Sequence, residues 1–171
     1  MKRIQNFGLI YIILLICQVM LCNYTNLGPY IMLTLLPAMI LCLPTKINAI
    51  TCLIIAFASG FAADWLADGL LGLNVAALLP AALIRKGTIR IFMGEDLIVR
   101  NDSFSIKKNG LGKVSISLIT LTAIFLTVYI FLDGAGSRPF LFCAIKFGVS
   151  LVCNWGLGLL VIKALTTDDR K

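Results

Sequence analysis

The sequence predicts an all-α integral membrane protein: one bundle of about six transmembrane helices, with both termini in the cytoplasm. Hydrophobic residues make up 60% of the 171 residues, and the mean hydropathy is +0.98. Several apolar runs approach the roughly 20 residues needed to cross a bilayer, and short polar breaks separate them. Almost every cation lies in alternate breaks. We therefore expect residues 1–171 to form a single membrane domain.

The first two apolar runs are 7–24 and 29–43. The run 7–24 follows Lys2 and Arg3, as in a signal peptide, but no small-residue cleavage site ends it, so we expect a retained first span. The run 29–43 is short for a span. Pro37 in its middle is expected to kink the helix, which bilayer helices tolerate when neighbouring groups satisfy the freed carbonyl.

The next two runs, 47–66 and 73–84, are separated by a glycine-containing turn. The run 73–84 is short and contains Pro80. If 29–43 and 73–84 were re-entrant elements, the number of spans would change. Both are taken here as complete spans, because about six spans agree best with the alternation of charge.

The longest polar stretch, 85–110, is expected to be a cytoplasmic loop. Polar and apolar residues alternate over 88–91 and 103–107, which is the period of a strand. A short hairpin or extended arm against the inner leaflet and a solvated loop both fit this pattern. The last two spans are expected at 111–132 and 140–162.

The distribution of charge predicts the topology. Of the 15 Lys and Arg residues, all except Arg138 and Lys146 fall on one side of the expected spans. Lys and Arg are retained on the cytoplasmic side during insertion, so that side is assigned to the cytoplasm. The net charge of +7 would also suit a nucleic-acid partner, but cations at the ends of apolar runs form no single basic face. We expect the lipid bilayer as a partner and no nucleic acid.

The composition argues against an enzyme. The chain has no His, and its six cysteines include no C-x-x-C pair. The commonest general base and metal ligand is therefore missing, and the cysteines are expected to be packing residues. The sequence also contains no phosphate-binding glycine loop, no dinucleotide motif and no nucleophile elbow. We predict no catalytic residue, no cofactor and no metal.

Polar and small residues inside the expected spans are candidates for structural or interaction roles. Asp64 fits either an anchor that faces the bundle interior or an acid at the outer water boundary. Lys146 fits either extension to the outer surface or a pair with Asp64. Asn154 lies deeper and is expected to bond to another helix. Ala56 and Gly60, four residues apart, favour a close approach of helices.

Two segments resemble the rod shape-determining protein MreD family. The first hairpin of that family is similar to residues 18–28, Q-V-M-L-C-N-Y-T-N-L-G. Its most recognisable segment is similar to residues 60–77, G-F-A-A-D-W-L-A-D-G-L-L-G-L-N-V-A-A. That segment has an Asp near the end of the third span, a glycine-containing turn and G-L-N before a small-residue helix. The match adds Gly69, Gly72 and Asn74 to the candidate site residues, although many relatives have His in place of this Asn.

The resemblance implies a non-enzymatic protein of the bacterial inner membrane that is needed for rod shape. Members of that family belong to the cell-elongation complex, which carries out lateral peptidoglycan synthesis. The expected partners are the bitopic protein MreC, the actin-like MreB, the glycosyltransferase RodA and a class B penicillin-binding protein.

The fold of that family resembles the substrate-binding subunits of energy-coupling-factor vitamin transporters, which supplies an alternative function. In this alternative the chain is a small-molecule capture subunit of a transporter. Such subunits pack an Ala-x-x-x-Ala face of the first helix against their transport partner, and the run 7–24 contains no such pair. The sequence therefore favours the scaffold.

Overall fold

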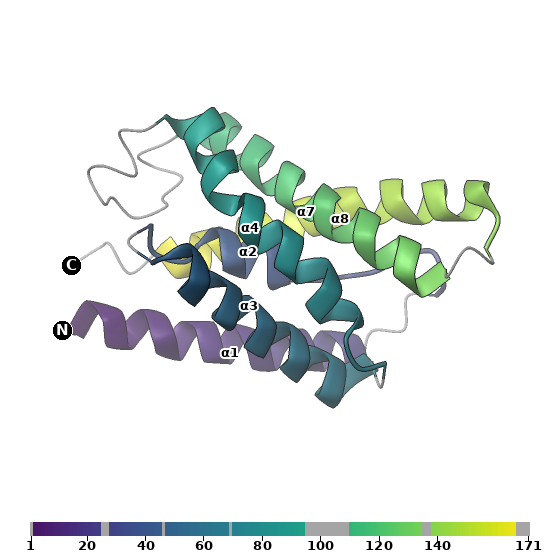
Figure 1. Ribbon diagram of the computed structural model, residues 1–171, viewed down its shortest axis with the longest axis horizontal. Coiled ribbons are helices and arrows are strands. Elements are labelled where there is room, and N and C mark those ends of the chain that lie inside the picture. The colour runs from purple at the N-terminus through teal and green to yellow at the C-terminus, as the bar shows by residue number, and fades with distance from the viewer. Residues whose placement is uncertain are drawn as a thin grey trace.

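The computed structural model describes residues 2–24, 28–45, 47–68, 70–94, 110–134 and 138–166, and within these ranges it contains helices and no strand. The helices of Figure 1 are α1 (Lys2–Tyr24), α2 (Leu36–Leu41), α3 (Ala49–Ala63), the π-helix η1 (Asp64–Asp68), α4 (Leu73–Met93), α7 (Leu111–Gly134) and α8 (Phe140–Thr166).

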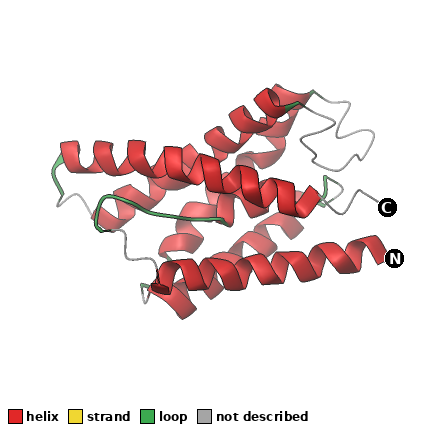
Figure 2. Cartoon of the chain, turned by 180° about the vertical axis from the view of Figure 1, so that it is seen from behind, coloured by secondary structure: helices red, strands yellow, loops and turns green. Residues whose placement is uncertain are grey.

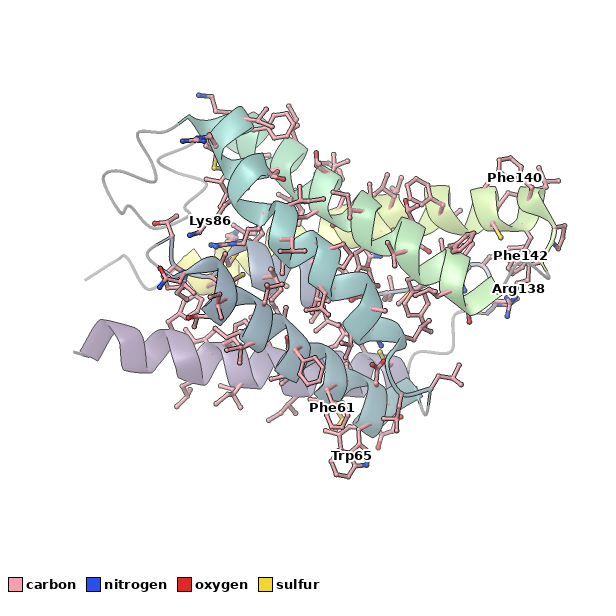
Figure 3. The ribbon with its side chains drawn as sticks, in the orientation of Figure 1. Phe61, Trp65, Lys86, Arg138, Phe140 and Phe142 are labelled. Atoms are coloured by element: carbon pink, nitrogen blue, oxygen red, sulfur yellow. The ribbon has the colours of Figure 1, made fainter. Side chains whose placement is uncertain are left out.

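The long helices run back and forth between two ends of the molecule (Figure 1). One end, which we call the η1 end, holds η1, the start of α4, the end of α7 and the start of α8. The other, which we call the basic end, holds the start of α1, the end of α4, the start of α7 and the end of α8. Arg90 lies in the last turn of α4, Lys113 in the first turn of α7 and Lys163 in the last turn of α8, and Lys86 lies on α4 before Arg90. Figure 3 shows this separation, with Lys86 at one end and Arg138 at the other.

Helix α4 is the centre of the bundle and packs between α3 and α7, while α8 packs on α7. Helix α1 lies at the edge, against α2, α3, η1 and α8. Hydrogen bonds to α3 and η1 help to fix it there. The Tyr11 hydroxyl donates to Ser59 Oγ at 3.4 Å, and Asn23 Nδ2 donates to the Leu66 carbonyl at 3.1 Å.

The surface is apolar and the interior holds polar groups. Within the described residues, four stretches are long and apolar enough to cross a bilayer: Phe7–Tyr24, Ala49–Ala67, Leu111–Gly134 and Phe140–Leu165. Large apolar side chains face outward from them, and Figure 3 shows Phe61 and Trp65 projecting away from the bundle. By contrast, Asp64 and Arg85 are fully buried. Charged groups inside and apolar groups outside are the arrangement of a membrane-embedded protein.

The second apolar run, 29–43, is not the kinked helix that we expected. Residues 31–35 belong to no helix and run as an elongated segment (Figure 2), in which Leu35 already has helical dihedral angles, and only Leu36–Leu41 of this run form a helix, all of whose residues are buried. Pro37 lies in the first turn of α2, where a proline is readily accommodated, so it causes no kink. Because extended chain advances about 3.3 Å per residue against about 1.5 Å in a helix, this short run still travels far along the bundle.

Helix α4 continues past Ile84 to Met93, so the expected loop does not begin at residue 85. The buried residues Arg85, Thr88 and Ile89 follow helical spacing, whereas Lys86 and Arg90 are exposed. The strand considered for 88–91 is therefore wrong, because these residues are helical and their burial does not alternate from one residue to the next. The similar stretch 103–107 lies outside the described residues.

Candidate functional site

Asp64 binds the beginning of α4. Its side chain is fully buried at the start of η1. Oδ2 accepts the backbone N–H groups of Gly72 at 2.9 Å and Val75 at 3.3 Å, and Oδ1 accepts that of Asn74 at 2.9 Å. The first N–H groups of a helix have no partner within the helix, and the helix dipole favours a negative charge beside them. Asp64 therefore caps α4 from another element.

The glycines of this region have steric roles. A Cβ added to Gly60 would lie 2.9 Å from the Val75 Cα atom, so α3 and α4 can approach this closely only if residue 60 is glycine. Gly72 precedes α4 with a φ of 97°, a left-handed conformation that favours glycine. Gly69 lies outside the described residues. Gly60, Asp64, Gly72 and Asn74 thus meet in one unit, which we call the α3–α4 hairpin.

Asn154 and two further side chains hold the extended segment 31–35. An extended backbone inside a bilayer must find partners for its N–H and C=O groups within the protein. These come from α8 and α1, and in Figure 2 the segment is the green line beside the red helices. The bonds are Met32 N to Ser150 Oγ (2.9 Å), Thr34 N to Asn154 Oδ1 (2.7 Å), Asn154 Nδ2 to Met32 O (2.8 Å) and Leu35 N to Gln18 Oε1 (2.6 Å).

The pairing of Lys146 with Asp64 is wrong, because the Lys146 ammonium bonds to Asp133. Lys146 Nζ lies 2.9 Å from Asp133 Oδ2, and 5.9 Å from the centre of the Tyr129 ring, within the range of a cation–π interaction. Arg138 approaches the same carboxylate oxygen at 3.9 Å. Asp64 has its acceptor oxygens occupied by α4 and lies on another element. We call Asp133, Arg138 and Lys146 the Asp133 cluster.

A cavity of about 280 Å³ opens beside the Asp133 cluster at the η1 end. All three members of the cluster line it, together with Tyr129, Cys22 and part of the segment 28–33. Its charged groups are two cations and one carboxylate. The cavity therefore suits a small ligand that carries negative charge.

Arg85 is a structural residue that sequence reasoning placed in a cytoplasmic loop. It is fully buried in α4. Its Nε donates to the Leu41 carbonyl at 3.3 Å, and Nη2 donates to the Leu43 carbonyl. Leu41 is the last residue of α2 and Leu43 lies two residues beyond it, where backbone acceptors lack helical partners and a positive charge is favoured. Arg85 therefore caps α2 as Asp64 caps α4.

Sequence reasoning missed the roles of Gln18, Asp133 and Ser150 as well. One signal was available for Ser150, because Lys146, Ser150 and Asn154 follow each other at intervals of four and so share a face of α8. All three are buried. The candidate residues thus fall into three groups: the α3–α4 hairpin, the contacts on segment 31–35 and the Asp133 cluster.

Comparison with known proteins gives no match to a family model, to a curated protein or to a solved structure. The function must therefore be argued from the residues and their geometry.

Proposed function

We propose that this protein is a non-enzymatic scaffold of the bacterial cell-elongation complex, which holds an MreC-like bitopic protein and, with it, MreB, RodA and a class B penicillin-binding protein. This proposal rests on the contacts made by segment 60–77, the part most similar to the MreD family. Asp64 has both carboxylate oxygens bonded to backbone N–H groups, and Gly60 permits helix contact. The segment that resembles MreD most therefore uses its acid to hold the start of α4 and its glycine to bring two helices together, which are structural roles.

Other polar side chains in the interior also support the scaffold. Gln18, Ser150 and Asn154 bind backbone groups of segment 31–35, and Arg85 binds carbonyls at the end of α2. Their hydrogen bonds hold non-helical or terminal backbone inside an apolar bundle, which such backbone requires. Side chains used in this way suit a protein that acts by contact and not by chemistry.

The proposed topology has six passes across the bacterial inner membrane, with the basic end and both termini in the cytoplasm. The four apolar helices, α4 and the segment 28–43 are the six passes. Lys86, Arg90, Lys113 and Lys163 at the basic end support this orientation, because cations are retained in the cytoplasm. The η1 end then faces the periplasm.

The cavity beside the Asp133 cluster favours a second candidate, a small-molecule capture subunit of a transporter. Its volume of about 280 Å³ lies near the lower end of the range for ligand pockets. Buried Lys146 gives it a fixed charge. The first helix still lacks the Ala-x-x-x-Ala face that such subunits use, so the scaffold remains the stronger proposal.

Depletion of the protein in a rod-shaped bacterium distinguishes the scaffold from the capture subunit. Loss of the scaffold should make cells wide or round while bulk peptidoglycan synthesis continues, and detergent extracts should retain the MreC-like partner. The capture subunit would instead carry a bound vitamin, and added nutrient would restore growth. Depleted cells that keep their rod shape and recover with a nutrient would overturn the scaffold in favour of the transporter.

A further inference from the structure

An apolar groove of about 530 Å³ lies between α7 and α8 at the η1 end. Side chains such as Ile130, Phe131, Phe140 and Phe147 line it, with Cys143 and Ala144. The two helices cross and diverge toward this end (Figure 1). Phe131 and Phe140 are among the most exposed apolar side chains, at 74% and 87%. The groove is therefore open to the acyl chains of the bilayer.

Of the described residues that line the groove, Arg138 is the charged one, and it also lines the cavity beside the Asp133 cluster. In Figure 3 it lies at the η1 end, near Phe140 and Phe142. Its guanidinium carbon is 5.1 Å from the centre of the Phe142 ring. It precedes α8, which begins at Phe140, so it lies where a membrane helix meets the headgroup layer. One side chain thus joins an apolar groove to a polar cavity.

Among the described residues, one acid is in contact with the two cations of this site. Asp133 is the acid in contact with both cations, and its Oδ2 lies 2.9 Å from Lys146 Nζ but 3.9 Å from Arg138 Nη2. The closer Lys146 neutralises the carboxylate. The side chain of Arg138 remains 40% exposed and retains a net positive charge that can bind phosphate with its planar fork of N–H groups.

From these observations we propose that the η1 end binds one anionic phospholipid, with its phosphate on Arg138 and one acyl chain in the groove between α7 and α8. A free phosphate has no acyl chain that could occupy the apolar groove. A zwitterionic lipid would bring its own cation toward Arg138 and Lys146. The inference is independent of the proposed scaffold role.

Lipid binding to the full-length protein in detergent tests this site. Native mass spectrometry should show retention of phosphatidylglycerol in preference to phosphatidylcholine, by roughly tenfold, as expected for one charge-assisted contact. Glycerol phosphate, which has the headgroup charge without chains, should not displace the lipid at equal concentration. Equal retention of both lipids, or displacement by glycerol phosphate, would overturn the proposal.

Two variants separate the two parts of the site. Arg138→Gln should reduce retention of phosphatidylglycerol roughly tenfold, whereas Lys86→Gln, an equal charge change at the basic end, should not. Ala144→Phe fills the groove without changing charge and should also reduce retention, whereas Val152→Phe on the same exposed side of α8 should not. Wild-type retention in either Arg138→Gln or Ala144→Phe, or equal losses in the controls, would refute the site.

Discussion

At the scale of single residues, buried polar side chains form hydrogen bonds with backbone groups that have no backbone partner. Asp64 supplies acceptors for the start of α4, and Arg85 supplies donors for the end of α2. Asn154 both accepts and donates on segment 31–35. Each of these residues is buried, so each bond is made where water cannot replace it. Removing one side chain leaves backbone groups without partners.

We expect Asp64→Leu to destabilise the protein by on the order of 3 kcal/mol, because buried N–H groups at the start of α4 lose their acceptor. Asp64→Asn keeps one acceptor oxygen and should cost less, about 1 to 3 kcal/mol. Thermal unfolding in detergent micelles measures both. Wild-type melting temperatures in both variants would place Asp64 outside the stabilising network and contradict its role as a cap.

Asn154→Leu should destabilise by about 1 to 3 kcal/mol for each backbone group left unpaired, namely the Thr34 N–H and the Met32 carbonyl. Thr120→Val is a suitable control, because the Thr120 hydroxyl donates an exposed hydrogen bond to the Ile116 carbonyl of its own helix. Hydrogen exchange at the Thr34 amide, which loses its acceptor, should rise in Asn154→Leu and stay unchanged in the control. Unaltered exchange at this amide would disprove the role of Asn154.

At the scale of elements, apolar runs predicted the long helices well and the irregular pieces poorly. The runs 7–24, 47–66, 111–132 and 140–162 are helical, as predicted, because each is long enough to satisfy its backbone internally. The extended form of 29–43 depends on partners in α1 and α8 that no local pattern reveals. For the same reason, no local pattern in the sequence revealed the bond between Lys146 and Asp133.

The contact between α3 and α4 gives a prediction at this scale. Gly60→Ala adds a Cβ 2.9 Å from the Val75 Cα atom, so the helices must move apart. We expect a loss of about 1 to 3 kcal/mol, typical of overpacking, and a lower melting temperature. Gly87→Ala is the matched control, because a Cβ at that position meets nothing within 4 Å. If Gly60→Ala melts no lower than Gly87→Ala, the close approach is not required.

At the scale of the whole molecule, the segregation of charge predicts which end lies in the cytoplasm. Single cysteines in a cysteine-free background, labelled with a membrane-impermeant maleimide, test this topology. Tyr24→Cys and Phe140→Cys should react from the periplasmic side, whereas Lys86→Cys should react only after the membrane is opened. Lys86→Cys that reacts in intact cells would reverse the orientation.

The tether of segment 31–35 to α8 has a consequence for biosynthesis. The hydrogen-bond partners of the Met32 and Thr34 N–H groups lie 118 and 120 residues later in the chain. A nascent chain leaves the ribosome from its N-terminus, so this backbone enters the lipid before Ser150 and Asn154 have been translated. Insertion of the last helix is therefore the step that completes the fold. A chain that stops before α8 should be an early substrate for membrane proteases, even though most of its helices are already made.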